Sequence, residues 1–249
     1  MSTTEKPKVW AHRGASAYAP ENTMPAFLLA LQQEADGIEL DVQMTKDKRL
    51  VVIHDERVDR TSDGTGFVRD MTFAELSALN FNKNFPKYGR VEIPTLEEVL
   101  DLIQKSDLML NIELKNGIFE YPGLEEHVKK YVTYKGVQDQ VIISSFNHYS
   151  LRTVGEIWQE IPRGLLYSDR WIDVPDYAKN LGLNALHPAY YHLSDGTLVE
   201  EAHKRGLKVH VWTVNEKADM ERCKALSVDA IITNDPKLAR EVVDAEADS

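Results

Sequence analysis

Histidine and arginine side chains stand at the ends of two short apolar runs in this chain. His12 ends the run Lys8–His12 and is followed by Arg13, and His54 ends the run Arg49–His54. Two histidines can serve as general acid and general base, and an arginine can bind a phosphate oxygen through paired hydrogen bonds. With a metal to polarise the phosphoryl group, these residue types are the parts that cleavage of a phosphodiester needs.

Three carboxylates and a lysine follow the same pattern. Glu39 and Asp41 stand two residues apart, so their side chains share one face of a strand, and Glu113 and Lys115 repeat this spacing. Burying three carboxylates together is unfavourable unless a cation compensates, and a divalent metal is the simplest such cation. The alternatives are a solvated strand edge for the first pair and a plain ion pair for the second.

A hairpin would bring the second histidine to the carboxylates. The runs Gly37–Thr45 and Arg49–His54 are separated by a short polar connection, which suits an antiparallel hairpin and cannot hold a crossover helix. If the turn is Asp47-Lys48, Asp41 lies opposite His54. The histidine then folds back beside the acidic cluster.

Apolar runs recur along the chain with helical stretches between them, and several are apolar on both faces, as buried parallel strands are. This alternation predicts a closed (β/α)8 TIM barrel, with an open doubly wound sheet as the alternative. In such a barrel the C-terminal ends of the strands carry the active site. The predicted strands are Lys8–His12, Gly37–Val42, Leu108–Leu114, Val141–Ser145, Gly164–Tyr167, Ala185–His187, Val209–Thr213 and Ala230–Ile232.

Amphipathic segments between the strands predict helices, with Thr95 and Ser144 as start signals. We interpret Lys46–Pro94 as an insertion after the second strand, folded over the barrel mouth, within a single catalytic domain that spans residues 1–249. The predicted helices are Thr23–Glu34, Leu96–Gln104, Tyr149–Trp158, Gly196–Arg205 and Glu216–Ala225, with a short one at Thr72–Ala78 in the insertion.

Several short motifs occur in an order that resembles the glycerophosphodiester phosphodiesterase family. They are His12-Arg13-Gly14, Pro20-Glu21-Asn22-Thr23, Glu39-Leu40-Asp41-Val42, His54-Asp55, Ile112-Glu113-Leu114-Lys115, Ser145-Phe146, Val211-Trp212-Thr213-Val214-Asn215 and Ile232-Thr233-Asn234-Asp235-Pro236. Any one motif is weak, but the ordered set from about Val9 to Pro236 is specific.

The resemblance implies a TIM barrel with a small insertion after the second strand. It also implies hydrolysis of glycerophosphodiesters to sn-glycerol 3-phosphate and an alcohol, with Mg2+ or Ca2+ as the cofactor. The attacking group would be the glycerol 2-hydroxyl, forming a cyclic phosphate, or water. By the same resemblance, Glu39, Asp41 and Glu113 would bind the metal, His12 and His54 would act as acid and base, and Arg13 and Lys115 would hold the phosphate.

Other residues near the strand ends have competing interpretations. Asn22 precedes a helical stretch, so we expect a helix N-cap in preference to contact with the substrate. Trp212 stands near a strand end beside Asn215 and is expected to line the substrate pocket. Phe146 is assigned to the same pocket, although a core position fits it equally. His187 ends a predicted strand and is expected to face the mouth in preference to the core.

The composition excludes some partners. The chain has 29 lysines and arginines against 40 acidic residues, a formal net charge of -11, which repels nucleic acid and anionic membranes. A small anion can still bind where a metal or local cations offset this charge. The single cysteine, Cys223, fits a reducing compartment. Because no apolar stretch reaches signal-peptide or membrane-span length, we expect a cytoplasmic protein without membrane insertion.

Three other functions compete with a soluble phosphodiesterase. A lysophospholipase D-like relative would favour an exposed apolar rim near the mouth, and the aromatic residues of the insertion are mixed with basic ones and form no clear membrane anchor. A non-catalytic barrel that binds a phosphorylated ligand would lack a catalytic histidine or a metal ligand. A metal-dependent lyase would not need the histidine pair with its adjacent arginine. The complete motif set favours the hydrolase.

Overall fold

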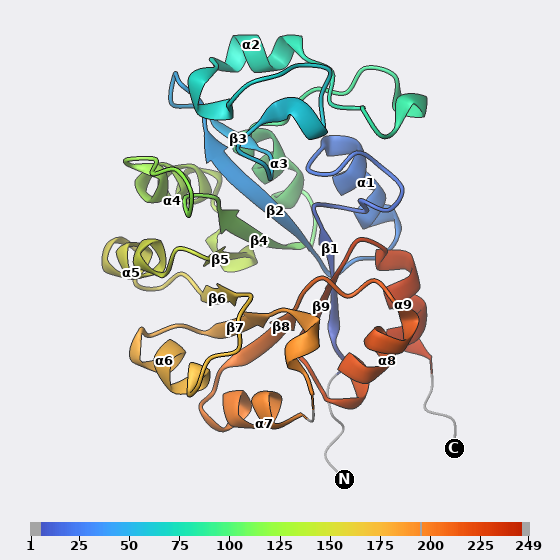
Figure 1. The fold of residues 1–249 in the computed structure, drawn as a ribbon, viewed down its shortest axis with the longest axis vertical. Helices are drawn as coiled ribbons and strands as arrows, with labels where there is room; N and C mark the ends of the chain where they lie inside the picture. The colour runs from blue at the N-terminus through green and yellow to red at the C-terminus, as the bar shows by residue number, and fades with distance from the viewer. Residues whose placement is uncertain (1–5, 195, 246–249) are drawn as a thin grey trace.

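Parallel strands close into a barrel in this computed structural model, which describes residues 6–194 and 196–245 (Figure 1). Neighbouring strands follow one another around the barrel, and the pairing of β1 with β2 closes it. An additional strand, β3, pairs antiparallel with β2. The strands are β1 (Lys8–His12), β2 (Gly37–Met44), β3 (Leu50–Val52), β4 (Met109–Leu114), β5 (Val141–Ser145), β6 (Arg163–Tyr167), β7 (Ala185–Pro188), β8 (Lys208–Val211) and β9 (Ala230–Thr233).

Helices follow most of the strands, and Figure 1 shows all of them except α2 around the outside of the barrel. None of the helices in the described part of the chain combines the length and the apolar character that crossing a membrane requires. The helices are α1 (Met24–Gln32), α2 (Phe73–Ala78), α3 (Leu96–Ile103), α4 (Leu124–Lys135), α5 (His148–Ile157), α6 (Val174–Asn180), α7 (Thr197–Lys204), α8 (Lys217–Ala225) and α9 (Pro236–Asp244).

The barrel predicted from the alternation of strands and helices is confirmed. An open doubly wound sheet is wrong, because β1 and β2 pair directly and leave no free edge between them. Each predicted strand overlaps an observed one. The largest difference is at β8, which ends at Val211, and the next residue, Trp212, makes only an isolated bridge to Ala189.

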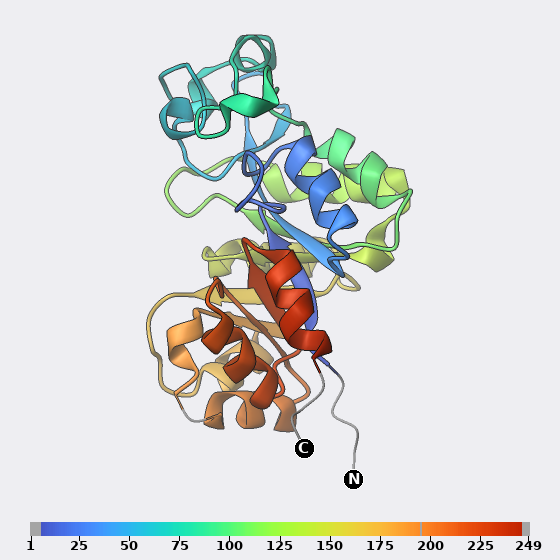
Figure 2. The ribbon, with the colours of Figure 1, turned by 90° about the vertical axis from the view of Figure 1, so that its right-hand side faces the viewer.

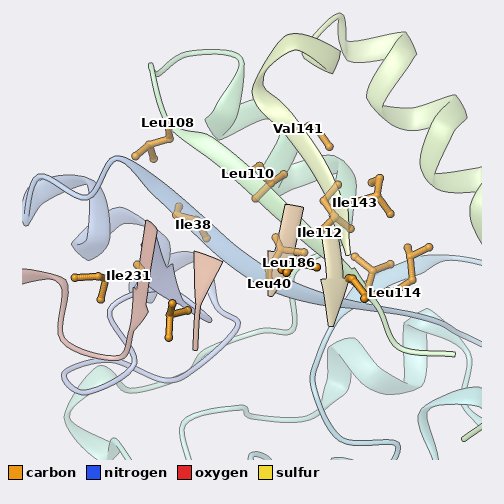
Figure 3. Close-up of a cluster of buried hydrophobic side chains, with 14 of the residues drawn as sticks. Ile38, Leu40, Leu108, Leu110, Ile112, Leu114, Val141, Ile143, Leu186 and Ile231 are labelled. Atoms are coloured by element: carbon orange, nitrogen blue, oxygen red, sulfur yellow. The ribbon is translucent and has the colours of Figure 1, made fainter. Parts of the chain in front are cut away.

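Successive side chains of each strand point to opposite faces of the barrel wall. Ile38 and Leu40 of β2 and Ile112 of β4 belong to the large hydrophobic core between barrel and helices (Figure 3). Glu39 and Asp41 alternate with these residues and therefore lie on the inner face. A separate inner cluster contains Trp10, Ile142, Ala185, Ala230 and Ile232.

The β2–β3 hairpin differs by one residue from the predicted register. Asp41 lies opposite Ile53 and not His54, and the Ile53 backbone N–H donates to the Asp41 carbonyl oxygen at 2.9 Å. The turn holds three residues, Lys46–Lys48, in place of the expected two, and Lys48 is left-handed with a φ of 66°. His54 therefore stands just beyond the paired region, where the chain turns toward the barrel mouth.

The segment between β3 and α3 forms a small unit with a hydrophobic core of its own. In Figures 1 and 2 this unit lies at the opposite end of the molecule from α6 and α7. The Tyr88 hydroxyl donates to the Tyr18 carbonyl oxygen at 3.1 Å, and the Arg69 guanidinium lies 3.5 Å from the centroid of the Phe119 ring. The unit therefore contacts the loops after β1 and β4 at the mouth of the barrel. Its core contains one residue of β3, Val51, together with Ile53, Val58, Val68, Leu76, Phe81, Val91 and Ile93.

Two expected helix starts have different outcomes. Thr95 begins α3 as predicted, because its hydroxyl accepts from the Glu98 backbone N–H and the Glu98 carboxylate accepts from the Thr95 backbone N–H. Ser144 is wrong as a start, because it lies inside β5. Helix α5 begins instead after Asn147, whose side-chain oxygen accepts backbone N–H groups of the first turn.

Candidate active site

The polar residues at the strand ends surround a cavity of about 80 Å³ at the mouth of the barrel. Asp41 and Lys115 lie beside it, since Lys115 Nζ is 2.9 Å from Glu113 Oε1 and 3.8 Å from Asp41 Oδ1. All the residues assigned to the site from the sequence are therefore brought together. The cavity is lined by His12, Arg13, Glu39, His54, Asn111, Glu113, Phe146, Leu166, Trp212, Thr213 and Ile232.

Three buried carboxylates form the floor of the site. Glu39, Asp41 and Glu113 each offer an oxygen within 4.8 Å of the other two, and Asp41 pairs in register with Glu113 across β2 and β4. Burial and the neighbouring carboxylates raise the pKa of Glu39 well above its ordinary value and raise the pKa of Glu113. Burial opposes ionisation of Asp41 too, but Arg13 and further cationic neighbours lower the pKa of Asp41 to about 2.

The donor set fits a divalent cation with oxygen ligands. Asp41 Oδ1 and Asn111 Oδ1 are buried and accept no hydrogen bond from the described part of the chain. An unsatisfied buried oxygen is costly, and a cation among the carboxylates would satisfy it while favouring their ionised forms. Carboxylate and amide oxygens are the ligands that Mg2+ and Ca2+ prefer.

His12 is held in one orientation at the end of β1. Its Nδ1 lies 2.6 Å from Asn234 Oδ1, and its Nε2 lies 3.9 Å from Glu39 Oε2. Burial, followed by the positive charge of Arg13, lowers the pKa of His12 to about 4, so the imidazole is neutral at neutral pH. With Nδ1–H donated to the amide oxygen, Nε2 carries the lone pair on the side of the carboxylates.

His54 is positioned by two side chains that follow and precede it in the chain. Its Nδ1 lies 2.6 Å from Asp55 Oδ1, and this hydrogen bond is the main cause that holds the pKa of Asp55 below its usual range. Gln43 is fully buried, and its Nε2 lies 3.0 Å from the His54 carbonyl oxygen and 2.7 Å from that of Asp55. The Tyr121 hydroxyl donates to Gln43 Oε1 at 2.8 Å, so the amide group itself is fixed.

Arg13 is tied to both the carboxylates and the insertion. Its Nη1 lies 2.8 Å from Glu21 Oε1, and its Nε lies 3.5 Å from Asp41 Oδ2. Arg60 of the insertion binds the same Glu21 at 2.6 Å and also binds Asp55 at 2.7 Å. One arginine of the insertion therefore braces the carboxylates that orient Arg13 and His54.

Asn22 caps no helix, contrary to the expectation from the sequence. Its φ is 56°, and helix α1 has Thr23 as its N-cap residue. The Asn22 side chain instead donates from Nδ2 to Asp41 Oδ2 at 2.8 Å, within the core of the site. The residue orients a carboxylate of the acidic cluster, which is neither of the two roles considered from the sequence.

Aromatic rings form the opposite wall of the cavity. Phe146 and Trp212 meet edge to face with ring centroids 5.5 Å apart, and Phe146 is 41% exposed. Trp212 Nε1 donates to the His187 carbonyl oxygen at 2.7 Å, which fixes the indole ring. Both rings therefore line the mouth, as expected, and Phe146 is not a core residue.

His187 does not face the mouth, so that expectation is wrong. It is fully buried inside the barrel, and its Nε2 lies 2.9 Å from His210 Nδ1. The ring of Trp10 packs against His210 with centroids 4.5 Å apart. The two histidines therefore pack against each other deeper in the barrel than the site.

Comparison with known proteins identifies the family. The model of the glycerophosphoryl diester phosphodiesterase family matches residues 12–238. The chain belongs to this family. A glycerophosphodiester phosphodiesterase from Caldanaerobacter subterraneus is 48% identical over 233 residues, which cover 93% of this chain and 96% of that protein.

Solved structures of glycerophosphodiester phosphodiesterases have the same fold. A phosphodiesterase from Oleispira antarctica, in complex with the product sn-glycerol-3-phosphate, is 30% identical with a TM-score of 0.88, covering 96% of this chain and 98% of that one. A putative glycerophosphoryl diester phosphodiesterase from Silicibacter pomeroyi is 25% identical with a TM-score of 0.87, covering 96% and 93%. The resemblance seen in the sequence is confirmed, and the protein is an enzyme of the phosphoric diester hydrolase class.

The structure adds to this phosphodiesterase site residues that sequence reasoning did not assign. Gln43, Asp55 and Asn234 hold the two histidines, and Asn22 holds a metal-binding candidate. Asp55 and Asn234 lie within two of the motifs that carry the family resemblance, so their position in the sequence could have identified them as site residues. Gln43 follows Glu39 and Asp41 on the inner face of β2 at the same spacing of two residues, so counting one step further would have found it.

Proposed function

We propose that this chain hydrolyses glycerophosphodiesters to sn-glycerol 3-phosphate and an alcohol with one bound divalent ion, Mg2+ or Ca2+. The observation that carries the proposal is the meeting of Glu39, Asp41 and Glu113 with His12 and His54 around one cavity. Membership of the family supports the substrate class. An ion held by the three carboxylates would supply polarisation of the phosphoryl group and neutralise its charge.

The environments of the two histidines favour different roles. His12 is neutral, with the Nε2 lone pair on the side of the acidic cluster, so it suits the general base. His54 has the carboxylate of Asp55 against Nδ1, which orients the ring, so it suits the second role, the general acid that protonates the leaving alcohol. Arg13 and Lys115 are the cations placed to bind the phosphate oxygens.

The attacking oxygen is the glycerol 2-hydroxyl, forming a cyclic phosphate, or a water molecule. The same base serves both routes, because each requires removal of a proton from an oxygen beside the phosphorus. A substrate in which the 2-hydroxyl is replaced by hydrogen separates them. Turnover of that substrate supports attack by water, and its complete resistance supports the cyclic route.

The experiment that tests the proposed function is release of sn-glycerol 3-phosphate from glycerophosphocholine and glycerophosphoethanolamine. We expect release that is abolished by EDTA and restored by Mg2+ or Ca2+. His12→Ala and His54→Ala are each expected to lower kcat by about 100-fold or more while the circular dichroism spectrum is unchanged. A folded wild-type protein that releases nothing with any metal would refute the proposal, and normal turnover in either variant would remove that histidine from the mechanism.

A lysolipid is a second candidate substrate because of one observation. Ile118, in the loop after β4, is 72% exposed, and Ile172, in the loop after β6, is 91% exposed. Exposed aliphatic side chains beside a barrel mouth can contact a lipid chain. In the insertion, by contrast, Phe67, Phe81 and the other aromatic residues are buried or half-buried. Turnover of lysophosphatidylcholine above that of glycerophosphocholine would favour the lysolipid.

We further propose that residues 1–249 act as one catalytic domain in the cytoplasm, on a small-molecule substrate and without nucleic acid. The net charge of -11 and the single, buried cysteine support this assignment. Cell fractionation with antibody detection tests the location, and a nucleic-acid gel-shift assay tests the excluded partner.

A further inference from the structure

A second and larger cavity opens beside the active site. Its volume is about 730 Å³, and it shares Phe146 and Leu166 with the site cavity. The site cavity, at about 80 Å³, is much the smaller of the two. Because the two cavities adjoin at Phe146 and Leu166, a substrate whose phosphate lies beside the acidic cluster can extend past Phe146 into the larger cavity.

Aromatic rings dominate the wall of this larger cavity. Trp171 is 44% exposed, Tyr149 is 74% exposed and Tyr177 is 38% exposed, so part of each ring is accessible to a ligand. Trp171 is held by rings on two sides, with centroids 5.6 Å from Tyr177 and 5.2 Å from His148. These residues come from the loop after β6 and from helices α5 and α6, so the rings surround the cavity and do not form a flat patch.

Two carboxylates complete the lining. Glu120, in the loop after β4, and Asp169, in the loop after β6, are both exposed, and neither takes part in an ion pair with the described residues. The cationic residue of the lining, Arg152, lies over the Tyr149 ring at 5.2 Å and pairs with Glu156 at 4.0 Å. Negative charge in the cavity is therefore free to attract a ligand, whereas the positive charge is already engaged.

We propose that the larger cavity binds the alcohol leaving group and selects alcohols that carry a quaternary ammonium group. The inference rests on the proposed function, because it names the substrate class of the same site. Aromatic faces attract such cations, and the effect grows when the cation leaves water. Glu120 and Asp169 add a long-range attraction, and they disfavour an anionic alcohol. Asn116, Asn147 and Ser168 add polar groups to the lining.

Direct binding tests the cation site without any turnover. Calorimetric titration compares choline with 3,3-dimethyl-1-butanol, a neutral alcohol of the same shape. We expect choline to bind and the neutral alcohol to bind at least about tenfold more weakly, and we expect Trp171→Leu to abolish the difference. Ile172→Ala is the matched control, because Ile172 is 91% exposed beside Trp171 and does not line the cavity. Equal binding of the two alcohols to the wild type would overturn the proposal.

Turnover tests whether the cation site acts on the substrate. We expect kcat/KM for glycerophosphocholine to exceed that for glycerophosphoglycerol. Trp171→Leu is expected to lower the former about tenfold and leave the latter unchanged. Glu120→Gln with Asp169→Asn should act in the same direction, and Glu160→Gln, which removes an exposed carboxylate outside the cavity, serves as the control. Equal loss for both substrates in Trp171→Leu would overturn the inference. Choline binding with no turnover of any diester would instead refute the proposed function and leave the cation site standing.

Discussion

The base assigned to the reaction is His12, whose ring is held by the side-chain amide of Asn234. Burial and then Arg13 lower the pKa of His12 to about 4, so kcat/KM should rise with pH through this low value and be level near neutrality. Asn234→Asp places a carboxylate against His12 Nδ1 and favours the charged imidazole, which raises its pKa. We expect the acidic limb of the kcat/KM profile to move upward by about one pH unit or more.

The control for this prediction is Asn234→Ser, which removes the amide without adding charge and should not raise the acidic limb. Both profiles are measured with saturating metal, so that loss of metal at low pH does not produce the limb. An unshifted limb in Asn234→Asp would show that His12 is not the base whose titration governs the rate.

The acidic cluster makes a separate prediction about metal binding. Glu113→Gln removes one of three carboxylates and leaves its neighbours Glu39 and Asp41 in place. We expect the affinity for Mg2+ and Ca2+ to fall about tenfold or more, because affinity for hard cations depends on the number of charged ligands. Titration calorimetry measures it, with the surface variant Glu156→Gln as control. Unchanged metal affinity and unchanged metal dependence of turnover would remove Glu113 from the ligand set.

At the scale of the elements, the sequence predicts which face of a strand a side chain occupies more reliably than it predicts the geometry of a turn. Glu39 and Asp41 alternate with large aliphatic residues, so their inward placement follows from the period of a strand alone. The register of the hairpin depended instead on one backbone torsion, the left-handed φ of Lys48. Lysine gives no signal for that conformation, whereas glycine or asparagine would have done so.

Contacts between distant elements were beyond the reach of the sequence. Asn22 lies in the loop after β1, and its partner Asp41 lies on β2. An asparagine before a helix has a good local use as a cap, so local reasoning prefers that role. His187 was misplaced for a related reason. Its position near a strand end suggested the mouth, but its inner-face neighbour His210 on β8 lies deeper in the barrel and binds it there.

The strained turn makes a prediction at the level of the hairpin. Lys48 is exposed and adopts a φ of 66°, which is unfavourable for a residue with a Cβ atom. Lys48→Gly should relieve this strain and raise the free energy of unfolding by about 0.5–1 kcal/mol, measured by urea denaturation. Turnover should not change, because the turn lies at the far end of β2 and β3 from the site.

The comparison for this variant is Lys48→Ala, which keeps a Cβ atom and should give no gain in stability. If Lys48→Gly were less stable than Lys48→Ala, the added freedom of glycine in the unfolded chain would outweigh the strain, and the turn would not be a strained element.

At the scale of the whole molecule, the barrel contains two groups of titratable side chains, one at its mouth and one in its interior. The mouth holds the acidic cluster, and the interior below it holds the pair His187 and His210. Burial lowers the pKa of His187 to about 3, and burial together with His187 lowers the pKa of His210 well below its ordinary value. These histidines are therefore neutral in the folded protein at pH values where they are charged in the unfolded chain.

The sign of the resulting pH dependence follows from proton binding. Below about pH 6.5, His187 and His210 bind protons in the unfolded chain but remain neutral in the folded barrel. The free energy of unfolding therefore decreases as the pH falls. The slope is about 1.4 kcal/mol per pH unit for each such histidine. The raised pKa values of Glu39 and Glu113 act in the opposite direction, since the stability linked to them is lost as the pH rises.

A variant separates the histidine contribution from that of the carboxylates. His187→Gln keeps a polar side chain but cannot be protonated. As the pH falls below about 6.5, the free energy of unfolding should therefore decrease less steeply in this variant than in the wild type. The two slopes should differ by up to ~1.4 kcal/mol per pH unit. Urea denaturation of the EDTA-treated proteins measures these slopes without a contribution from metal binding. The carboxylates titrate in the variant and in the wild type alike, so their effect cancels in the difference between the two slopes. His203→Gln, which removes a half-exposed surface histidine, is the control. Equal slopes in His187→Gln and the wild type would mean that the buried pair accepts protons without unfolding the barrel.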